Sequence, residues 1–326
     1  MTKPGGRILV TLSTFCEDDA APRRRLEASG FTFVENTSGR RMTPEEVLAH
    51  GTDWIGLIAG VEPYTAETLA KLPRLKCISR VGVGVDSIDL AAARARGIVV
   101  RNTPDAPILA VAEMAIAHIL DVLKLTTYHT ALMRQRRWAK KTGSMLGGKG
   151  VGLVGVGRIG RCVAERLASF GVTLLGTDPV PDAKWAARTG LRYCGLEELL
   201  KTSDIVSVHA LRPAGQGPLI GAAEIARMKP GAILINTARG HLVDAAALEA
   251  ALRRGALAGA GLDVFPEEPY AGPLCELENV VLTPHIATLT KETRVQMETE
   301  AVENLLEELS QAAPRPSHSN RRGTRS

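Results

Sequence analysis

The feature that most constrains this chain is a glycine-rich turn set between a strand pattern and a helix pattern. Residues 155–160 read GVGRIG; they follow the apolar run Val151–Val154 and open the helical pattern Arg161–Phe170. In that setting GxGxxG spacing is specific: the first glycine permits a tight turn, the second lets the backbone approach a pyrophosphate, and the third lets helix pack on strand. Free N–H groups at the helix start can bind the phosphates. We therefore predict a dinucleotide site containing Gly155, Gly157 and Gly160.

The second strand of this unit indicates which dinucleotide is bound. The run Val172–Thr177 ends in Asp178, which lies 23 residues after Gly155. A carboxylate at that place accepts hydrogen bonds from the ribose hydroxyls and repels a 2′-phosphate. The alternative is a simple turn residue, since Pro179 follows. Because no arginine comes directly after Asp178, we expect NAD rather than NADP.

Short Val/Ile-rich runs alternate with helical patterns along the whole chain, which predicts α/β architecture with parallel sheets. In the first half the helix signals include a capping box that starts at Thr43 and a stop at Gly51. The expected strands there are Ile8–Thr11, Trp54–Ala59, Lys76–Ser79 and Ile98–Val100. In the second half they are Val151–Val154, Val172–Thr177, Ile205–Val208, Ala232–Ile235, Gly259–Leu262 and Val280–Thr283.

Composition excludes several classes of protein. The net charge is +5, but four arginines lie in a tail without acids, so the rest of the chain carries about +1 and gives no argument for nucleic-acid binding. The longest apolar stretch, Ile108–Leu123, is interrupted by Glu113, His118 and Asp121, and is expected to be a buried helix rather than a membrane span. The N-terminus does not have the pattern of a signal peptide.

The cysteines and histidines favour a cytoplasmic protein without a metal site. The five cysteines form no CxxC pair, so reduced thiols are the simplest interpretation. No group of Cys, His and Asp has the spacing of metal ligands.

Three further segments follow predicted strands. They read INTARG at 235–240, GLDVFPEEP at 261–269 and TPH at 283–285. Because ligands bind at the carboxyl ends of parallel strands, we expect these segments to converge at the cofactor.

Together the segments resemble the D-isomer-specific 2-hydroxyacid dehydrogenases, particularly the 3-phosphoglycerate dehydrogenase-like branch. The likeness runs from Ile8 to about Leu306 and includes RVGVGVD at 80–86 and NTP at 102–104. It implies an NAD-dependent enzyme that transfers a hydride between nicotinamide and a small D-2-hydroxy acid or 2-keto acid. It also implies two doubly wound domains, with a Rossmann NAD-binding domain inserted in a flavodoxin-like substrate domain.

By this resemblance the catalytic residues are Arg239, Glu268 and His285. A guanidinium can bind the adjacent carboxylate and carbonyl of a 2-keto acid. The imidazole can give and take the proton of the hydroxyl group near neutral pH, and a neighbouring carboxylate stabilises its charged form. Glu267 competes for the carboxylate role, but the family's glutamate directly precedes proline, which selects Glu268.

The resemblance also assigns binding residues. Besides the glycines and Asp178, those expected to line the cofactor are Arg158, Ile159, Thr237, Ala238 and Asp263. The substrate loop is expected to use Arg80 and the backbone N–H groups of Val83 and Gly84. His209 follows a strand and is interpreted as structural.

The resemblance further predicts the domain boundaries and the assembly. Residues 1–101 would begin the substrate-binding domain, 102–288 would form the NAD-binding domain, 289–310 would return to the first as a helix, and 311–326 would be a disordered basic tail. A homodimer is expected through the cofactor domain and the segment around Trp138.

The substrate stays open at this point. Phosphoglycerate-specific members carry an arginine in a loop that here reads AGVEPY at 59–64, which argues against phosphoglycerate. A hydroxypyruvate or glyoxylate reductase and a phosphonate-type dehydrogenase are the enzymatic alternatives. An NAD-sensing, corepressor-like binding protein is the alternative without catalysis.

Overall fold

The computed structural model describes residues 6–212 and 215–311. The chain divides into two compact units, one formed by Met1–Pro107 with Lys291–Ser326 and the other by Ile108–Thr290. The predicted boundaries lay at 101/102 and 288/289. Most of the predicted tail lies outside the described residues, but Gln311 ends the last helix.

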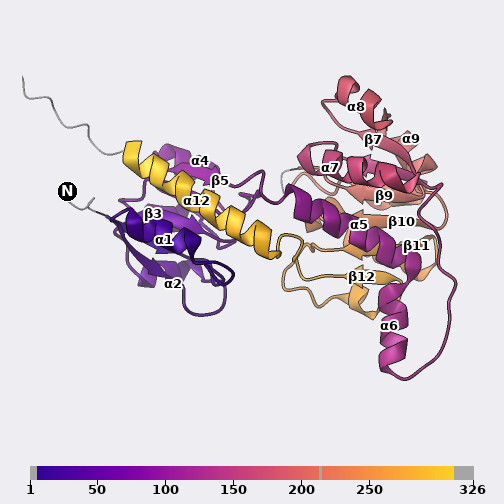
Figure 1. The fold of residues 1–326 in the computed structure, drawn as a ribbon, viewed down its shortest axis with the longest axis horizontal. Coiled ribbons are helices and arrows are strands. Elements are labelled where there is room, and N and C mark those ends of the chain that lie inside the picture. Colours follow the sequence, from indigo (N-terminus) through magenta and orange to yellow (C-terminus); the bar gives the residue numbers. More distant parts are fainter. Residues whose placement is uncertain (1–5, 213–214, 312–326) are drawn as a thin grey trace, which may run out of the picture. The chain divides into compact units, whose positions relative to one another are not determined.

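The first unit, which carries the labels α1, β3 and α12 in Figure 1, contains a five-stranded parallel sheet. Its strand order is β2-β1-β3-β4-β5. This is the strand order of flavodoxin-like folds. The strands are β1 Arg7–Val10, β2 Thr32–Glu35, β3 Trp54–Ala59, β4 Cys77–Arg80 and β5 Val99–Asn102. The helices are α1 Ala21–Ala28, α2 Pro44–Ala49, α3 Ala66–Ala70, α4 Leu90–Ala95 and α12 Lys291–Gln311.

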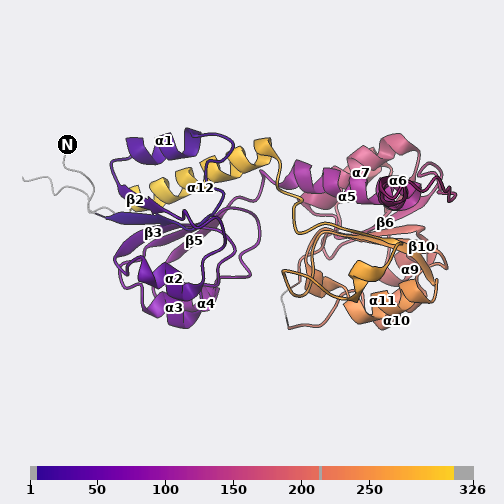
Figure 2. The same ribbon diagram turned by 90° about the horizontal axis from the view of Figure 1, so that it is seen from below.

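Helices cover both faces of this sheet. Figure 2 shows α1 and α12 on one face and α2, α3 and α4 on the other. Strand alternation supplies both layers, because Ile8 and Val10 pack with α1 and α12 whereas Leu9 packs with α2, α3 and α4.

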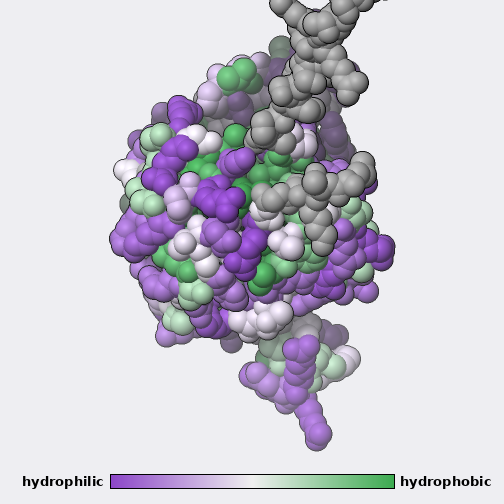
Figure 3. All heavy atoms as spheres, turned by 90° about the vertical axis from the view of Figure 1, so that its left-hand side faces the viewer, coloured by the Kyte–Doolittle hydropathy of each residue, from purple (hydrophilic) through white to green (hydrophobic). Residues whose placement is uncertain are grey.

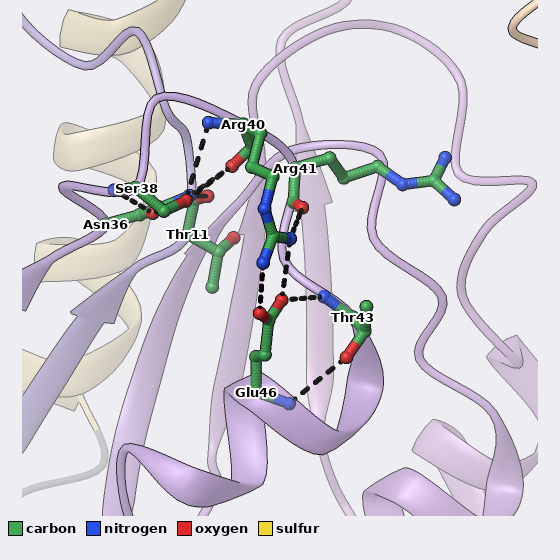
Figure 4. A network of polar contacts seen from close by, with 7 residues as sticks. All are labelled: Thr11, Asn36, Ser38, Arg40, Arg41, Thr43 and Glu46. Atoms are coloured by element: carbon green, nitrogen blue, oxygen red, sulfur yellow. Dashed lines mark hydrogen bonds and ion pairs between the residues drawn. The ribbon is translucent and has the colours of Figure 1, made fainter.

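The predicted capping box starts α2. The Thr43 side chain accepts a hydrogen bond from the Glu46 backbone, and Glu46 Oε2 accepts the Thr43 N–H at 2.8 Å (Figure 4). Arg40 pairs with the same carboxylate, while Asn36 Nδ2 donates to the carbonyl of Thr11 at 2.8 Å. These contacts attach the connection between β2 and α2 to the end of β1.

The second unit contains a seven-stranded parallel sheet of order β12-β11-β10-β9-β6-β7-β8. This is the Rossmann order with one further strand, β12, at the edge. The strands are β6 Gly150–Val154, β7 Thr173–Thr177, β8 Arg192–Tyr193, β9 Ile205–Val208, β10 Ala232–Asn236, β11 Leu257–Leu262 and β12 Val280–Leu282. The helices are α5 Ile108–Lys124, α6 Thr126–Arg134, α7 Arg158–Leu167, α8 Ala183–Thr189, α9 Leu196–Thr202, α10 Ala222–Arg227 and α11 Ala245–Arg253.

Every residue of the central strands β9 and β10 is buried. Burial on both sides is expected when helices cover both faces of a parallel sheet. One layer packs α5, α7 and α8 on the sheet, and the other packs α9, α10 and α11. The predicted α/β fold with two doubly wound parallel sheets is thereby confirmed.

The described surface mixes polar and apolar side chains. In the space-filling view hydrophilic residues are spread between hydrophobic ones over the visible face (Figure 3). None of the helices within residues 6–212 and 215–311 has the length and apolar composition needed to cross a bilayer.

Candidate active site

The glycine loop between β6 and α7 needs its glycines for different physical reasons. Gly155 has φ +94°, and a β carbon there would lie 2.6 Å from the backbone nitrogen of Ala210. A β carbon on Gly160 would lie 2.2 Å from the carbonyl oxygen of Gly155, so only glycine lets α7 pack this closely. At Gly157, the N-cap of α7, a β carbon would meet open space. Close packing below and open space at the helix start fit a bound pyrophosphate.

Asp178 lies directly after β7 and ties the glycine loop in place. Its Oδ2 accepts the N–H of Val156 at 2.8 Å, and its Oδ1 accepts the N–H of Val180 at 2.9 Å. Arg161 donates from Nε to the carbonyl of Val156 at 3.2 Å and pairs with Asp182 at 3.0 Å. The guanidinium of Arg161, which contacts this loop, is therefore already paired with a carboxylate.

The turn after β10 is ordered by Asn236. Its Nδ2 donates to the carbonyl of Arg239 at 2.9 Å, and its Oδ1 accepts the N–H of Ala238 at 3.0 Å. Arg239 donates from Nη1 to the carbonyl of Ala238 at 2.7 Å. The buried hydroxyl of Thr237 has no hydrogen-bond partner within the described part of the chain.

A second unpartnered polar atom lies beside the glycine loop. Nδ1 of His209 is buried without a partner among the described residues, while its Nε2 lies 2.9 Å from Ser207 Oγ. Burial lowers the pKa of His209 to about 4, so this imidazole is neutral at physiological pH. Buried polar groups normally have partners, so this atom and the hydroxyl of Thr237 are groups that a dinucleotide could satisfy.

His285 and Glu268 form a close pair. Nδ1 of the imidazole lies 2.8 Å from Glu268 Oε2, and the other oxygen of that carboxylate accepts the N–H of Phe265 at 3.0 Å. Both side chains are partly exposed, at 42% and 36%. The carboxylate beside the imidazole is thus that of Glu268 and not that of its neighbour Glu267.

The backbone of His285 is unusual. Its φ is +55°, the left-handed region that costs a non-glycine residue about 1–2 kcal/mol. The residues that follow it, Ile286 and Ala287, donate their N–H groups to the carboxylate of Asp263, each at 2.9 Å. Asp263 is fully buried, so its oxygens are directed into the loop that carries His285.

The expected substrate loop belongs to the first unit. The N–H of Gly82 donates to Thr103 Oγ1 at 2.7 Å, and Asn102 Nδ2 donates to the carbonyl of Val83 at 2.6 Å. The loop that starts at Arg80 and contains Gly84 is therefore braced by the end of β5 and the residue after it.

The neighbouring loop after β3 contains a buried carboxylate. Glu62 is 2% exposed, and its Oε2 accepts the N–H of Gly60 at 2.8 Å and the hydroxyl of Thr11 at 3.0 Å. Burial raises the pKa of Glu62. A carboxylate thus occupies the loop in which an arginine would mark phosphate specificity.

Comparison with known proteins assigns the family. Residues 116–287, more than half of the chain, match the model of the D-isomer specific 2-hydroxyacid dehydrogenase NAD binding domain. The chain belongs to the D-isomer-specific 2-hydroxyacid dehydrogenase family.

Individual proteins and solved structures are similar to this chain over most of its length. The D-3-phosphoglycerate dehydrogenase of Mycobacterium tuberculosis is 40% identical over 252 residues, which cover 76% of this chain and 48% of that protein. The structure of TT0316 protein from Thermus thermophilus has a TM-score of 0.86 at 37% identity and covers 94% and 98% of the two chains. A glyoxylate reductase from Paecilomyes thermophila has a TM-score of 0.84 at 30% identity, with 94% and 96% covered. The chain spans about half the length of the curated relatives it matches.

Two residues that lie behind Asp263 were not among the expected site residues. His118 and Thr283 are hydrogen-bonded to each other and, through Thr283, to Asp263. One sequence signal was available, because a histidine inside an otherwise apolar helix pattern requires a polar partner when it is buried. In the described part of the chain, His, Cys, Asp and Glu side chains form no group of three that could hold a metal ion.

Proposed function

We propose that this chain is an NAD-dependent dehydrogenase that interconverts a small D-2-hydroxy acid and its 2-keto acid. The observation that carries the proposal is the His285–Glu268 pair at 2.8 Å, which lies in the same unit as the glycine loop of the family's NAD-binding domain. Bound NAD supplies the hydride acceptor. The protein must then bind the acid and move one proton.

The hydrogen bond to Glu268 determines which imidazole nitrogen exchanges that proton. A carboxylate only accepts, so Nδ1 of His285 carries a hydrogen toward Glu268. The Nε2 nitrogen is then the one that takes the hydroxyl proton during oxidation and returns it during reduction. We assign to Arg239 the binding of the substrate carboxylate and carbonyl, because a guanidinium presents several donors in one plane.

The remaining assignments follow the residues of each loop. For the pyrophosphate we propose the glycine loop and the first turn of α7, which contain Gly155, Gly157, Arg158, Ile159 and Gly160. The N–H of Gly155 itself donates to the carbonyl of Thr177 at 2.9 Å, so this glycine shapes the turn. For the ribose we propose Asp178, and for the nicotinamide side Thr237, Ala238 and Asp263. For the substrate carboxylate we propose Arg80 with the N–H groups of Val83 and Gly84, which makes the first unit the substrate-binding domain.

Turnover tests this function and separates the candidate substrates. Oxidation of NADH should be measured with glyoxylate, hydroxypyruvate, phosphohydroxypyruvate and a keto phosphonate. The D-3-phosphoglycerate dehydrogenase relatives favour the phosphorylated acid, whereas the buried Glu62 in place of an arginine favours the unphosphorylated ones. If the protein binds NADH but turns over none of these acids, the proposed dehydrogenase activity is refuted. The remaining hypothesis is then an NAD-sensing, corepressor-like binding protein.

We also propose a cytoplasmic homodimer. Large apolar side chains are exposed on α6 and the segment after it: Met133 at 53%, Trp138 at 79% and Met145 at 72%. Exposed apolar side chains of this size in one segment mark an interaction surface. All five cysteines are free thiols, as expected in a reducing compartment.

A further inference from the structure

His118 is a buried imidazole of α5 that lies against the strand leading to Asp263. It is 2% exposed, and a β carbon on Gly261 of β11 would lie 2.7 Å from its Cβ. The missing side chain at Gly261 therefore lets α5 approach the sheet at this point. Nε2 of His118 lies 3.0 Å from the hydroxyl oxygen of Thr283, directly after β12.

The directions of these hydrogen bonds can be deduced. Thr283 has one hydroxyl proton, and its oxygen lies 2.5 Å from Oδ1 of Asp263, which as a carboxylate only accepts. The hydroxyl therefore donates to Asp263 and must accept from His118. This fixes the imidazole as the tautomer with hydrogen on Nε2. Its Nδ1 then carries no hydrogen and can only accept. No hydrogen-bond partner for this atom is found among the described residues.

The same carboxylate determines the backbone around His285. Asp263 is 0% exposed and receives Thr283 Oγ1 and the N–H groups of Ile286 and Ala287, so its buried charge is stabilised by three donors. Two of these donors directly follow His285, whose φ is +55°. A non-glycine residue stays in the left-handed region only where surrounding contacts hold its backbone there.

We propose that His118 and Thr283 are positioning residues that, through Asp263, hold the left-handed loop from which His285 acts. The catalytic part of this inference rests on the proposed function. The chain of donors runs from His118 to Thr283 to Asp263, and the loop is attached to the last of these. Burial lowers the pKa of His118, which keeps it in the neutral form that donates only from Nε2.

Thr283 offers a matched pair of variants. Thr283→Val keeps the shape but removes the hydroxyl, and Thr283→Ser keeps the hydroxyl. The valine variant should lower kcat about 10-fold, the scale of one hydrogen bond, with KM for the keto acid and Kd for NADH within about 2-fold of wild type. The serine variant should keep most of the activity. Thr173→Val, on the exposed position of β7, is the control for the substitution itself.

Hydrogen exchange supplies a readout that does not need turnover. Exchange of the amides of Ile286 and Ala287 should be about 10-fold faster in Thr283→Val and in His118→Leu than in the wild type, and near wild type in Thr283→Ser. Equal kcat and equal exchange in Thr283→Val and the wild type would overturn the proposal, as would a serine variant as impaired as the valine one. If the wild type turns over none of the acids, the proposed function fails, and with it the catalytic part. The exchange rates then still decide whether the hydrogen-bond chain holds the loop.

Discussion

Glu268 uses both of its carboxylate oxygens to orient His285: one lies 2.8 Å from the imidazole Nδ1, and the other accepts the N–H of Phe265 at 3.0 Å. The carboxylate is therefore fixed to the backbone before it meets the histidine. A fixed carboxylate orients the ring and selects the tautomer that carries hydrogen on Nδ1.

Removing the imidazole tests the proton step. His285→Ala should lower kcat about 100-fold or more, the scale of general acid–base catalysis. The variant should bind NADH like the wild type, because the glycine loop and Asp178 are unchanged. Stopped-flow measurement of the hydride step, with NADH titrated separately, distinguishes the two effects. A variant with nearly full kcat would show that another group moves the proton.

Replacing its carboxylate partner tests how His285 is oriented. The amide of Glu268→Gln can donate as well as accept, so the hydrogen on Nδ1 is no longer enforced. kcat should fall about 10-fold, the scale of losing such an orienting partner, while Kd for NADH stays near the wild-type value. Glu267→Gln, an exposed neighbour, is the matched control, and equal kcat in the two variants would exclude Glu268 as the orienting carboxylate.

Cofactor choice should depend on the carboxylate after β7. Asp178→Asn keeps one acceptor oxygen for the glycine loop but loses the charge, so it should mainly narrow the preference for NADH over NADPH. Asp178→Ala also releases the N–H of Val156 and should weaken binding of both. Fluorescence titration with NADH and with NADPH measures the two dissociation constants. The assignment fails if the wild type binds NADPH as tightly as NADH.

Assembly can be tested at the exposed tryptophan. Trp138→Glu places a charge where a large apolar side chain is 79% exposed, and it should convert the proposed homodimer to monomer at micromolar concentration. Light scattering reports the mass. Val180→Glu, which also replaces a side chain that is 79% exposed, is the control. A monomeric wild type would end this proposal.

Acid should destabilise the second unit through His209. Burial lowers its pKa from 6.5 to about 4, so below pH 6.5 the unfolded chain binds a proton that the folded chain does not. The free energy of unfolding should therefore be unaffected above pH 6.5 and fall by up to about 3 kcal/mol as the pH drops toward 4. Urea unfolding at several pH values measures this. In His209→Gln the free energy of unfolding should fall less over this pH range. An equal fall in the variant and the wild type would show that other groups cause it.

Most of the strands were predictable because their apolar runs are long enough to show. The ten predicted strands lie within two residues of observed ones at each end. The strand Thr32–Glu35 was missed, since its side chains are exposed or half-buried and its edge position needs no apolar run. The strand Arg192–Tyr193 was missed because two residues leave no pattern.

Site residues that belong to sequence motifs were predictable. Residues that reach the site only through the packing of distant elements were not. The segments that contain Glu268 and His285 stand in the sequence, and the structure brings these two side chains together. The contribution of His118 depends on the distance between α5 and β12, which lie far apart in the chain. No local pattern records that distance.

The first unit is built from two stretches of chain separated by the whole of the second. Met297, Ala301, Val302, Leu305 and Leu309 of α12 belong to one of its two apolar layers. The ribosome therefore synthesises the five strands of this unit long before α12, one of the two helices on that face. During synthesis the second unit can fold first, while the apolar face of β1 and β3 that packs on α12 is covered only in part, by α1. Packing of α12 is thus the last step in assembling the first unit. A chain arrested before Lys291 exposes part of that apolar face to chaperones.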